Sequence, residues 1–143
     1  MNNTSASMAE LFPLMQEILQ SGGEFRLFPQ GTSMLPLLKQ GADSVILRTD
    51  NNIKKGNICL YKRNNGDFVL HRVVKVEKNG TFVFRGDNQT KAEPDVQREQ
   101  IIAKVVRVMH GEKVVKPLTL WYGITRLSAP ARALRFRKRE AKK

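Results

Sequence analysis

The fold is decided by a stretch in the middle of the chain: FVLHRVVKV (residues 68–76), EKNG (77–80) and TFVF (81–84). Apolar and polar residues partly alternate in the first and last of these segments, which is typical of half-buried strands. Asn79-Gly80 between them supplies the positive φ angles that a tight hairpin turn requires. The stretch therefore predicts a β-hairpin.

Short apolar runs of the same kind lie on both sides of this hairpin, each bounded by turn residues such as Pro29 or Asn64-Asn65-Gly66. They cover residues 25–28, 44–48, 58–61 and 101–109. Six short strands at this spacing predict a mainly β domain, closed or strongly coiled so that its sheet edges are hidden.

Helical periodicity is confined to the two ends of the chain. Between Met8 and Gln20 one helical face carries Leu11, Met15, Ile18 and Leu19. Pro13 is best tolerated in a first turn, so we expect the regular part of this helix to begin near Phe12. After Pro117 apolar residues again step by three and four positions. The expected organisation is an N-terminal helix and cap in residues 1–23, a β-domain in residues 24–116 and a basic amphipathic helical tail in residues 117–143.

Charge is concentrated at the C-terminal end. The chain has 143 residues and a formal net charge of +12. From residue 101 onward it contains twelve basic residues and only two acidic ones, Glu112 and Glu140. This tail also carries Leu120, Trp121 and Ile124, so we expect it to bind an anionic membrane surface or to pack on the domain. Nucleic acid is the less favoured partner, because aromatic residues are scarce among the charges and no recognition helix is evident.

The rest of the composition narrows the class of protein. Cys59 is the only cysteine, which excludes an intrachain disulfide and favours a reducing compartment. No apolar run approaches the roughly 20 residues of a membrane-spanning helix, and the N-terminus lacks the features of a signal peptide. We therefore expect a cytoplasmic protein, with the inner face of the membrane as the surface that its tail could bind.

Neither a metal nor a cofactor is expected. Two histidines and one cysteine at wide spacing do not form a zinc site, and no phosphate loop or dinucleotide fingerprint is present. Cys59 could in principle pair with His71 or His110 as a reactive thiol. Its place in an apolar strand instead indicates an inert, buried cysteine, and His110 at a turn indicates a surface histidine.

Three segments could carry chemistry. The first is GTSMLP (residues 31–36), in which glycine and proline flank Ser33. A serine hydroxyl becomes nucleophilic when a base removes its proton on rigid, exposed backbone near free N–H groups. The alternative is a loop serine that caps a short helical turn.

The second segment, VLHRVV (residues 69–74), places His71 inside an apolar strand, and the third joins Gly86-Asp87-Asn88 to Glu93-Pro94-Asp95. Histidine has a pKa suited to accept a serine proton near neutrality, and a carboxylate beside it would fix its tautomer. The alternatives are a histidine on the solvent face of its strand and an ordinary β-turn at Asp87.

In order and spacing these segments resemble one family. The Gly-x-Ser-Met-x-Pro run is similar to the nucleophile motif of type I signal peptidases and of the related self-cleaving SOS-type repressors. The His-Arg-Val-Val segment resembles the form in endoplasmic-reticulum and archaeal signal peptidases, where histidine replaces the usual bacterial lysine. Gly86-Asp87-Asn88 resembles the Gly-Asp-Asn box of the family. The resemblance covers about residues 28–108, and it implies the strongly coiled β-domain of the signal-peptidase type.

The resemblance also implies roles for individual residues. Ser33 would be the nucleophile, His71 the general base and Asp95 the third member, with Glu93 as its competitor. Asp87 would be the box residue that shapes the site.

Two departures from the family pattern concern the oxyanion hole and the membrane. Signal peptidases have a serine two residues before the nucleophile, where this chain has Gly31. The oxyanion donors would then be the N–H of Ser33, with help from Thr32. Signal peptidases are also held at a membrane, and from the lack of a long apolar run in this sequence we expect no such anchor.

The implied function is that of a serine endopeptidase that hydrolyses the leader or signal region of another polypeptide. The alternative is a self-cleaving or catalytically silent regulator of the same family, which binds nucleic acid or a partner protein through its basic tail.

Overall fold

The computed structural model describes residues 7–35 and 37–115. The elements in these residues are α1 (Met8–Gln20), β1 (Phe25–Leu27), β2 (Asp43–Arg48), β3 (Ile58–Lys62), β4 (Phe68–Val76), β5 (Phe82–Arg85), β6 (Glu93–Val96), the 3-10 helix η1 (Arg98–Gln100), β7 (Ile101–His110) and β8 (Lys113–Val115). The predicted mainly β fold with a short N-terminal helix is confirmed. The helical tail predicted for residues 117–143 lies outside the described residues.

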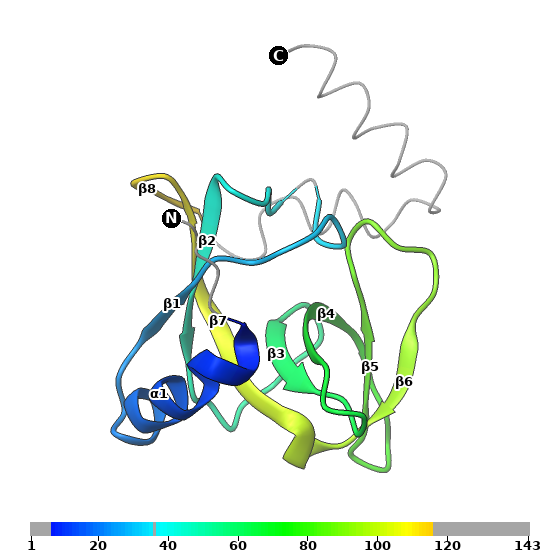
Figure 1. The fold of residues 1–143 in the computed structure, drawn as a ribbon. Coiled ribbons are helices and arrows are strands. Elements are labelled where there is room, and N and C mark those ends of the chain that lie inside the picture. The colour runs from blue at the N-terminus through cyan, green and yellow to red at the C-terminus, as the bar shows by residue number, and fades with distance from the viewer. Residues whose placement is uncertain (1–6, 36, 116–143) are drawn as a thin grey trace.

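All the strands pair antiparallel in one sheet, in the order β1-β2-β7-β3-β4-β5-β6, and β8 pairs with β7 off this path. Strand β7 connects the two halves, because it pairs with β2 along one part of its length and with β3 along another. The register shifts at Ile46/Leu47 and at Leu60/Tyr61. Such irregularities bend strands, and Figure 1 shows the sheet curling from β1 round to β6.

The core consists of two apolar clusters that share β3. Ile58 and Leu60 belong to the cluster that also contains Met15 and Leu19 of α1. Cys59 and Tyr61 belong to the second cluster, with Phe82 and Phe84 of β5. Alternate side chains of a strand point to opposite faces, so β3 is covered on both faces. This double burial explains the continuous apolar run at residues 58–61.

The helix occupies the predicted residues Met8–Gln20, but its regular part begins earlier than expected. Ser7 and Glu10 form a capping box, in which the Glu10 N–H donates to Ser7 Oγ at 3.2 Å and the Ser7 N–H donates to Glu10 Oε1 at 3.2 Å. This box starts the helix at Met8 and leaves Pro13 inside it, so the expectation that the regular part begins near Phe12 is wrong. Strands β6 and β8 were also not predicted, because each is short and β6 contains Pro94 and Asp95, which are typical of turns.

Candidate active site

Ser33 lies on a tight turn between β1 and β2. Gly31 adopts a φ of 83°, which favours glycine, and its N–H donates to the Gln40 side chain at 2.7 Å. The Leu35 N–H donates to the Thr32 carbonyl at 3.1 Å, which closes the turn. Met34 is buried in the core, whereas Ser33 is half-buried. These hydrogen bonds and the buried Met34 side chain therefore fix the turn, while Ser33 stays partly accessible.

The Gly-Asp-Asn segment (residues 86–88) also contacts the serine turn and holds it in place. The Asn88 N–H donates to the Ser33 carbonyl at 2.8 Å, and the Asn88 side-chain amide donates to the Thr32 carbonyl at 3.1 Å. Gly86 approaches so closely that a Cβ atom there would lie 2.6 Å from the Ser33 carbonyl oxygen. Glycine at this position thus permits the contact between the two segments.

Asp87 connects the same segment to β4. Its carboxylate accepts two hydrogen bonds from the Arg72 guanidinium, at 2.8 Å from Nε and 2.7 Å from Nη2, and the two side chains are almost completely buried. Arg72 Nη1 also donates to the Gly56 carbonyl at 2.9 Å. A bidentate pair of this kind fixes both orientation and distance. Because Arg72 follows His71 directly, the pair brings the three motifs of the sequence together at one place.

His71 is buried on β4, only 6% exposed, opposite Cys59 of β3 and edge-on to the Tyr61 ring at 6.4 Å. Burial, together with the positive charge of Arg63, lowers the pKa of His71 to about 4, although the charges of Glu93 and Asp87 act in the opposite direction. The imidazole is therefore neutral at pH 7 and can accept a proton. His71 and Ser33 line the same cavity, which has a volume of about 490 Å³.

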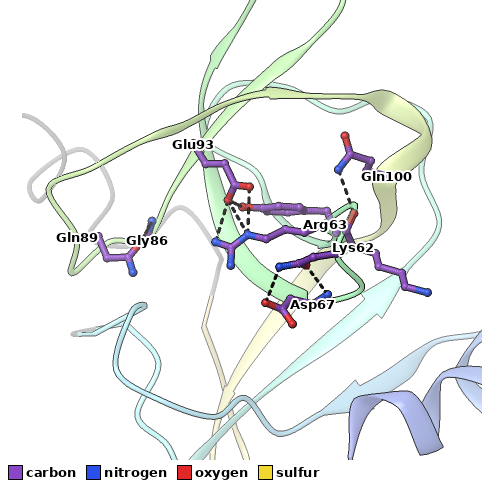
Figure 2. A network of polar contacts seen from close by, with 9 residues as sticks. Lys62, Arg63, Asp67, Gly86, Gln89, Glu93 and Gln100 are labelled. Atoms are coloured by element: carbon purple, nitrogen blue, oxygen red, sulfur yellow. Dashed lines mark hydrogen bonds and ion pairs between the residues drawn. The ribbon is translucent and has the colours of Figure 1, made fainter.

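Glu93 is held near His71 by two side chains at the end of β3. Its Oε1 accepts from the Tyr61 hydroxyl at 2.7 Å and from Arg63 Nη2 at 3.0 Å. Figure 2 shows the Glu93 carboxylate and the Arg63 guanidinium pointing toward each other. Burial acts to raise the pKa of Glu93, but the bonds from Arg63 and Tyr61 hold it below its usual range. Glu93 is thus a fixed anion near the histidine.

Asp95 lies two residues further along β6, where its side chain is exposed and its backbone has a φ of 61°. The carboxylates whose charges act on His71 are Glu93 and Asp87. The structure thus brings Glu93, the competitor named in the sequence analysis, near His71, whereas Pro94 and Asp95 are exposed. The catalytic role of either carboxylate stays a prediction.

Sequence reasoning did not identify Arg63 as part of the site. It follows β3 directly and precedes a turn, which is a common place for a solvated arginine. Its partner Glu93 is 30 residues away along the chain, and no local pattern connects the two. The same limit applies to the hydroxyl of Tyr61, which was assigned only to a strand.

The thiol alternative does not fit the structure. Cys59 is fully buried, as predicted, and burial raises the pKa of its thiol to about 12, so the reactive thiolate does not form near neutral pH. His110 lies at the end of β7, where its Nδ1 is 2.8 Å from Asp43 Oδ1. In residues 7–35 and 37–115 no group of three or more potential ligands could hold a metal ion.

Apolar side chains make up much of the lining of the cavity that Ser33 and His71 share. The side chains there come from the end of β1, the serine turn, β3 and the first half of β4, namely Leu27, Met34, Leu38, Leu60 and Leu70. Met8 and Leu11 of α1 complete the wall. The arrangement places a serine hydroxyl and an imidazole in the lining of one cavity, and groups of this kind can serve as nucleophile and proton acceptor in acyl transfer.

No helix in the part of the chain that the structure describes is long and apolar enough to cross a membrane.

Comparison with known proteins supplies a family. A search of curated proteins and a search of solved structures each found no match. The family model described as Peptidase S24-like, in contrast, matches residues 2–106, which include the serine turn, His71 and the Gly-Asp-Asn segment. The match covers well over half of the chain, and the protein therefore belongs to the Peptidase S24-like family.

Proposed function

We propose that this protein is a serine endopeptidase in which Ser33 is the nucleophile and His71 the general base. The observation that carries the proposal is that Ser33 and a neutral, buried His71 line one cavity. Membership of the Peptidase S24-like family supports it. The histidine in place of lysine gives the site the character of the histidine-type signal peptidases that the sequence resembles.

The chemistry requires His71 to accept a proton and return it once in acylation and once again in deacylation. Ser33 Oγ attacks the carbonyl carbon of the scissile bond while the imidazole takes the hydroxyl proton. The imidazolium then gives this proton to the leaving nitrogen, the C–N bond breaks, and the acyl group stays on Ser33. Water, deprotonated by His71, hydrolyses the ester and restores both groups. Glu93 stabilises the transient positive charge on the imidazole.

The first half of β4 offers a backbone edge for the substrate. Strand β4 pairs with β3 over Phe68–Arg72 but with β5 only from Arg72 onward, so among the described residues no strand pairs with residues 68–71 on the β5 side. Val73 uses its N–H and C=O toward Asn57 and Gly56 on the β3 side. By the alternation of antiparallel strands, Leu70 directs its backbone groups to the open side, and Leu70 lines the cavity.

An extended polypeptide can add to such an edge as a further strand. Its side chains on one face would then enter the apolar cavity next to Ser33. We propose, from the resemblance to signal peptidases, that the natural substrate is the leader or signal region of another polypeptide.

The proposal is tested with a mixed peptide library and mass spectrometry of the products. We expect cleavage by the native protein and none by Ser33→Ala or His71→Gln. Ser21→Ala and His110→Gln are the matched controls, because they change the same residue types outside the cavity and should cleave normally. If Ser33→Ala cleaves as well as the native protein, the peptidase proposal fails and the regulator alternative gains. The intact mass of the incubated protein shows whether it cleaves itself.

A further inference from the structure

A second hollow lies against the same histidine. It has a volume of about 690 Å³ and is lined by Phe84, by the loop of residues 88–92 and by the start of β6. His71, Arg63 and Gln89 line both hollows, whereas Ser33 lines only the first. His71 thus contributes to both hollows, of which the first is lined mostly by apolar residues and the second mostly by polar ones.

The chemistry of acyl transfer assigns the two hollows to the two halves of a substrate. The acyl half becomes bonded to Ser33 and stays in the first cavity. The leaving nitrogen must come within hydrogen-bond reach of His71, because this imidazole returns the proton to it. The part of the substrate that follows the leaving nitrogen would then extend into the second, polar hollow. We infer that this hollow binds the residues that follow the cleaved bond and favours acidic side chains there, an inference that rests on the proposed function.

The charge of the lining supports the preference. Glu93 is the carboxylate among the described residues that line the hollow, and Arg63 neutralises it in an ion pair at 3.0 Å. Lys91 adds an exposed positive charge, and Asn88 and Thr90 add polar side chains. The net positive charge attracts an acidic residue and repels a basic one. Since Lys91 is exposed, the preference should be about two- to fivefold and should weaken with salt.

The first experiment reads the residues on both sides of each cleaved bond in the peptide library. We expect acidic residues to be enriched after the bond and apolar residues before it. Lys91→Glu should reverse the preference after the bond and leave the preference before it unchanged. Lys78→Glu is the matched control, since it makes the same charge change on an exposed hairpin turn outside the hollow and should change neither preference.

A second experiment does not depend on catalysis. Two peptide amides with free N-termini, Ala-Glu-Glu-Ala and Ala-Lys-Lys-Ala, are titrated into the Ser33→Ala protein and followed through backbone amide NMR signals. The acidic peptide should bind more tightly and shift the signals of residues 88–92, and Lys91→Glu should remove this difference.

The outcomes separate the two proposals. If acidic peptides bind at residues 88–92 but no peptide is hydrolysed, the proposed acidic binding site is retained and the peptidase proposal is refuted. Cleavage without any charge preference after the bond, and without shifts at residues 88–92, would overturn the inference and retain the peptidase. The absence of both cleavage and binding would refute both.

Discussion

The backbone N–H of Asn88 donates a hydrogen bond of 2.8 Å to the carbonyl oxygen of Ser33. This bond joins the loop after β5 to the turn that carries the proposed nucleophile, 55 residues earlier in the chain. It fixes the backbone of the serine and leaves the hydroxyl free to act. The Gly-Asp-Asn segment is therefore a support for the serine turn as well as a turn in its own right.

This contact makes Gly86 sensitive to substitution. In Gly86→Ala the new Cβ would meet the Ser33 carbonyl oxygen at 2.6 Å, so the serine turn must shift. We expect kcat to fall by about tenfold or more, because a shift of about 1 Å at a reacting group can cost about a hundredfold. Gly80→Ala is the control. The positive φ at this position costs about 1–2 kcal/mol of stability in the variant. Its Cβ would meet no atom within 4 Å, and it lies in the β4–β5 turn, outside the serine turn. Equal kcat values in the two variants would contradict this prediction.

The buried pair of Arg72 and Asp87 should be essential for stability. Asp87→Ala leaves the buried guanidinium without its carboxylate, which typically costs about 3–5 kcal/mol in free energy of unfolding. Urea denaturation measures the change. Glu77→Ala removes the carboxylate of an exposed pair with Lys75 at 3.1 Å, and we expect it to cost less than about 1 kcal/mol. A loss near this smaller value for Asp87→Ala would show that the pair is unimportant for the fold.

The burial of His71 predicts a specific dependence of stability on pH. Its pKa is about 4 in the folded protein and about 6.5 in the unfolded chain, so the unfolded state binds more protons between these values. The stability is therefore complete above about pH 6.5 and decreases as the pH falls to about 4, by an amount on the order of 3 kcal/mol. His71→Gln should remove this part of the pH dependence. The imidazole NMR signals of His71 should titrate near pH 4, and a midpoint above 6 would contradict the prediction.

Glu93 and Asp95 can be separated by conservative substitution. Glu93→Gln removes the anion that acts on His71 and should lower kcat/KM by about tenfold or more, whereas Asp95→Asn should leave kcat/KM nearly unchanged. Because Glu93 raises the pKa of His71, Glu93→Gln should also move the acid limb of the pH–rate profile to lower pH. If Asp95→Asn is the more damaging change, the assignment based on the sequence holds instead.

The basic tail yields a prediction from the sequence alone, because residues 117–143 lie outside the described part of the chain. Lipid binding would bury Trp121, whereas phosphate contacts would not. We expect anionic vesicles to shift the fluorescence of Trp121, the single tryptophan, to the blue. Trp121→Ala should weaken vesicle binding with little change for duplex DNA. Tight DNA binding at physiological salt with unchanged fluorescence in vesicles would favour the regulator alternative.

Local chemistry explains what the sequence by itself determined. Alternating apolar residues and the Asn79-Gly80 turn predicted the β4–β5 hairpin, since strand periodicity and turn conformation depend on neighbouring residues. The mainly β class followed from the repetition of such runs. The order of the Ser33, His71 and Gly86-Asp87-Asn88 segments pointed to the signal peptidases and the related SOS-type repressors. The Peptidase S24-like match over residues 2–106 supports the broad group, and the histidine-type subtype stays a prediction. The capping box at Ser7 and Glu10 is also a local feature, and it decides the start of the helix in place of Pro13.

Only the tertiary structure decided how these segments meet. The carboxylate beside His71 is Glu93 because Tyr61 and Arg63, about thirty residues earlier in the chain, hold it there. Asp87 pairs with Arg72 in the interior, and His71 becomes a weak base because the sheet closes over it. Hydrogen bonding and desolvation act through space and depend on which strands become neighbours. A single sequence does not specify which strands pair. The motifs themselves were therefore predictable, whereas the surroundings of each side chain were not.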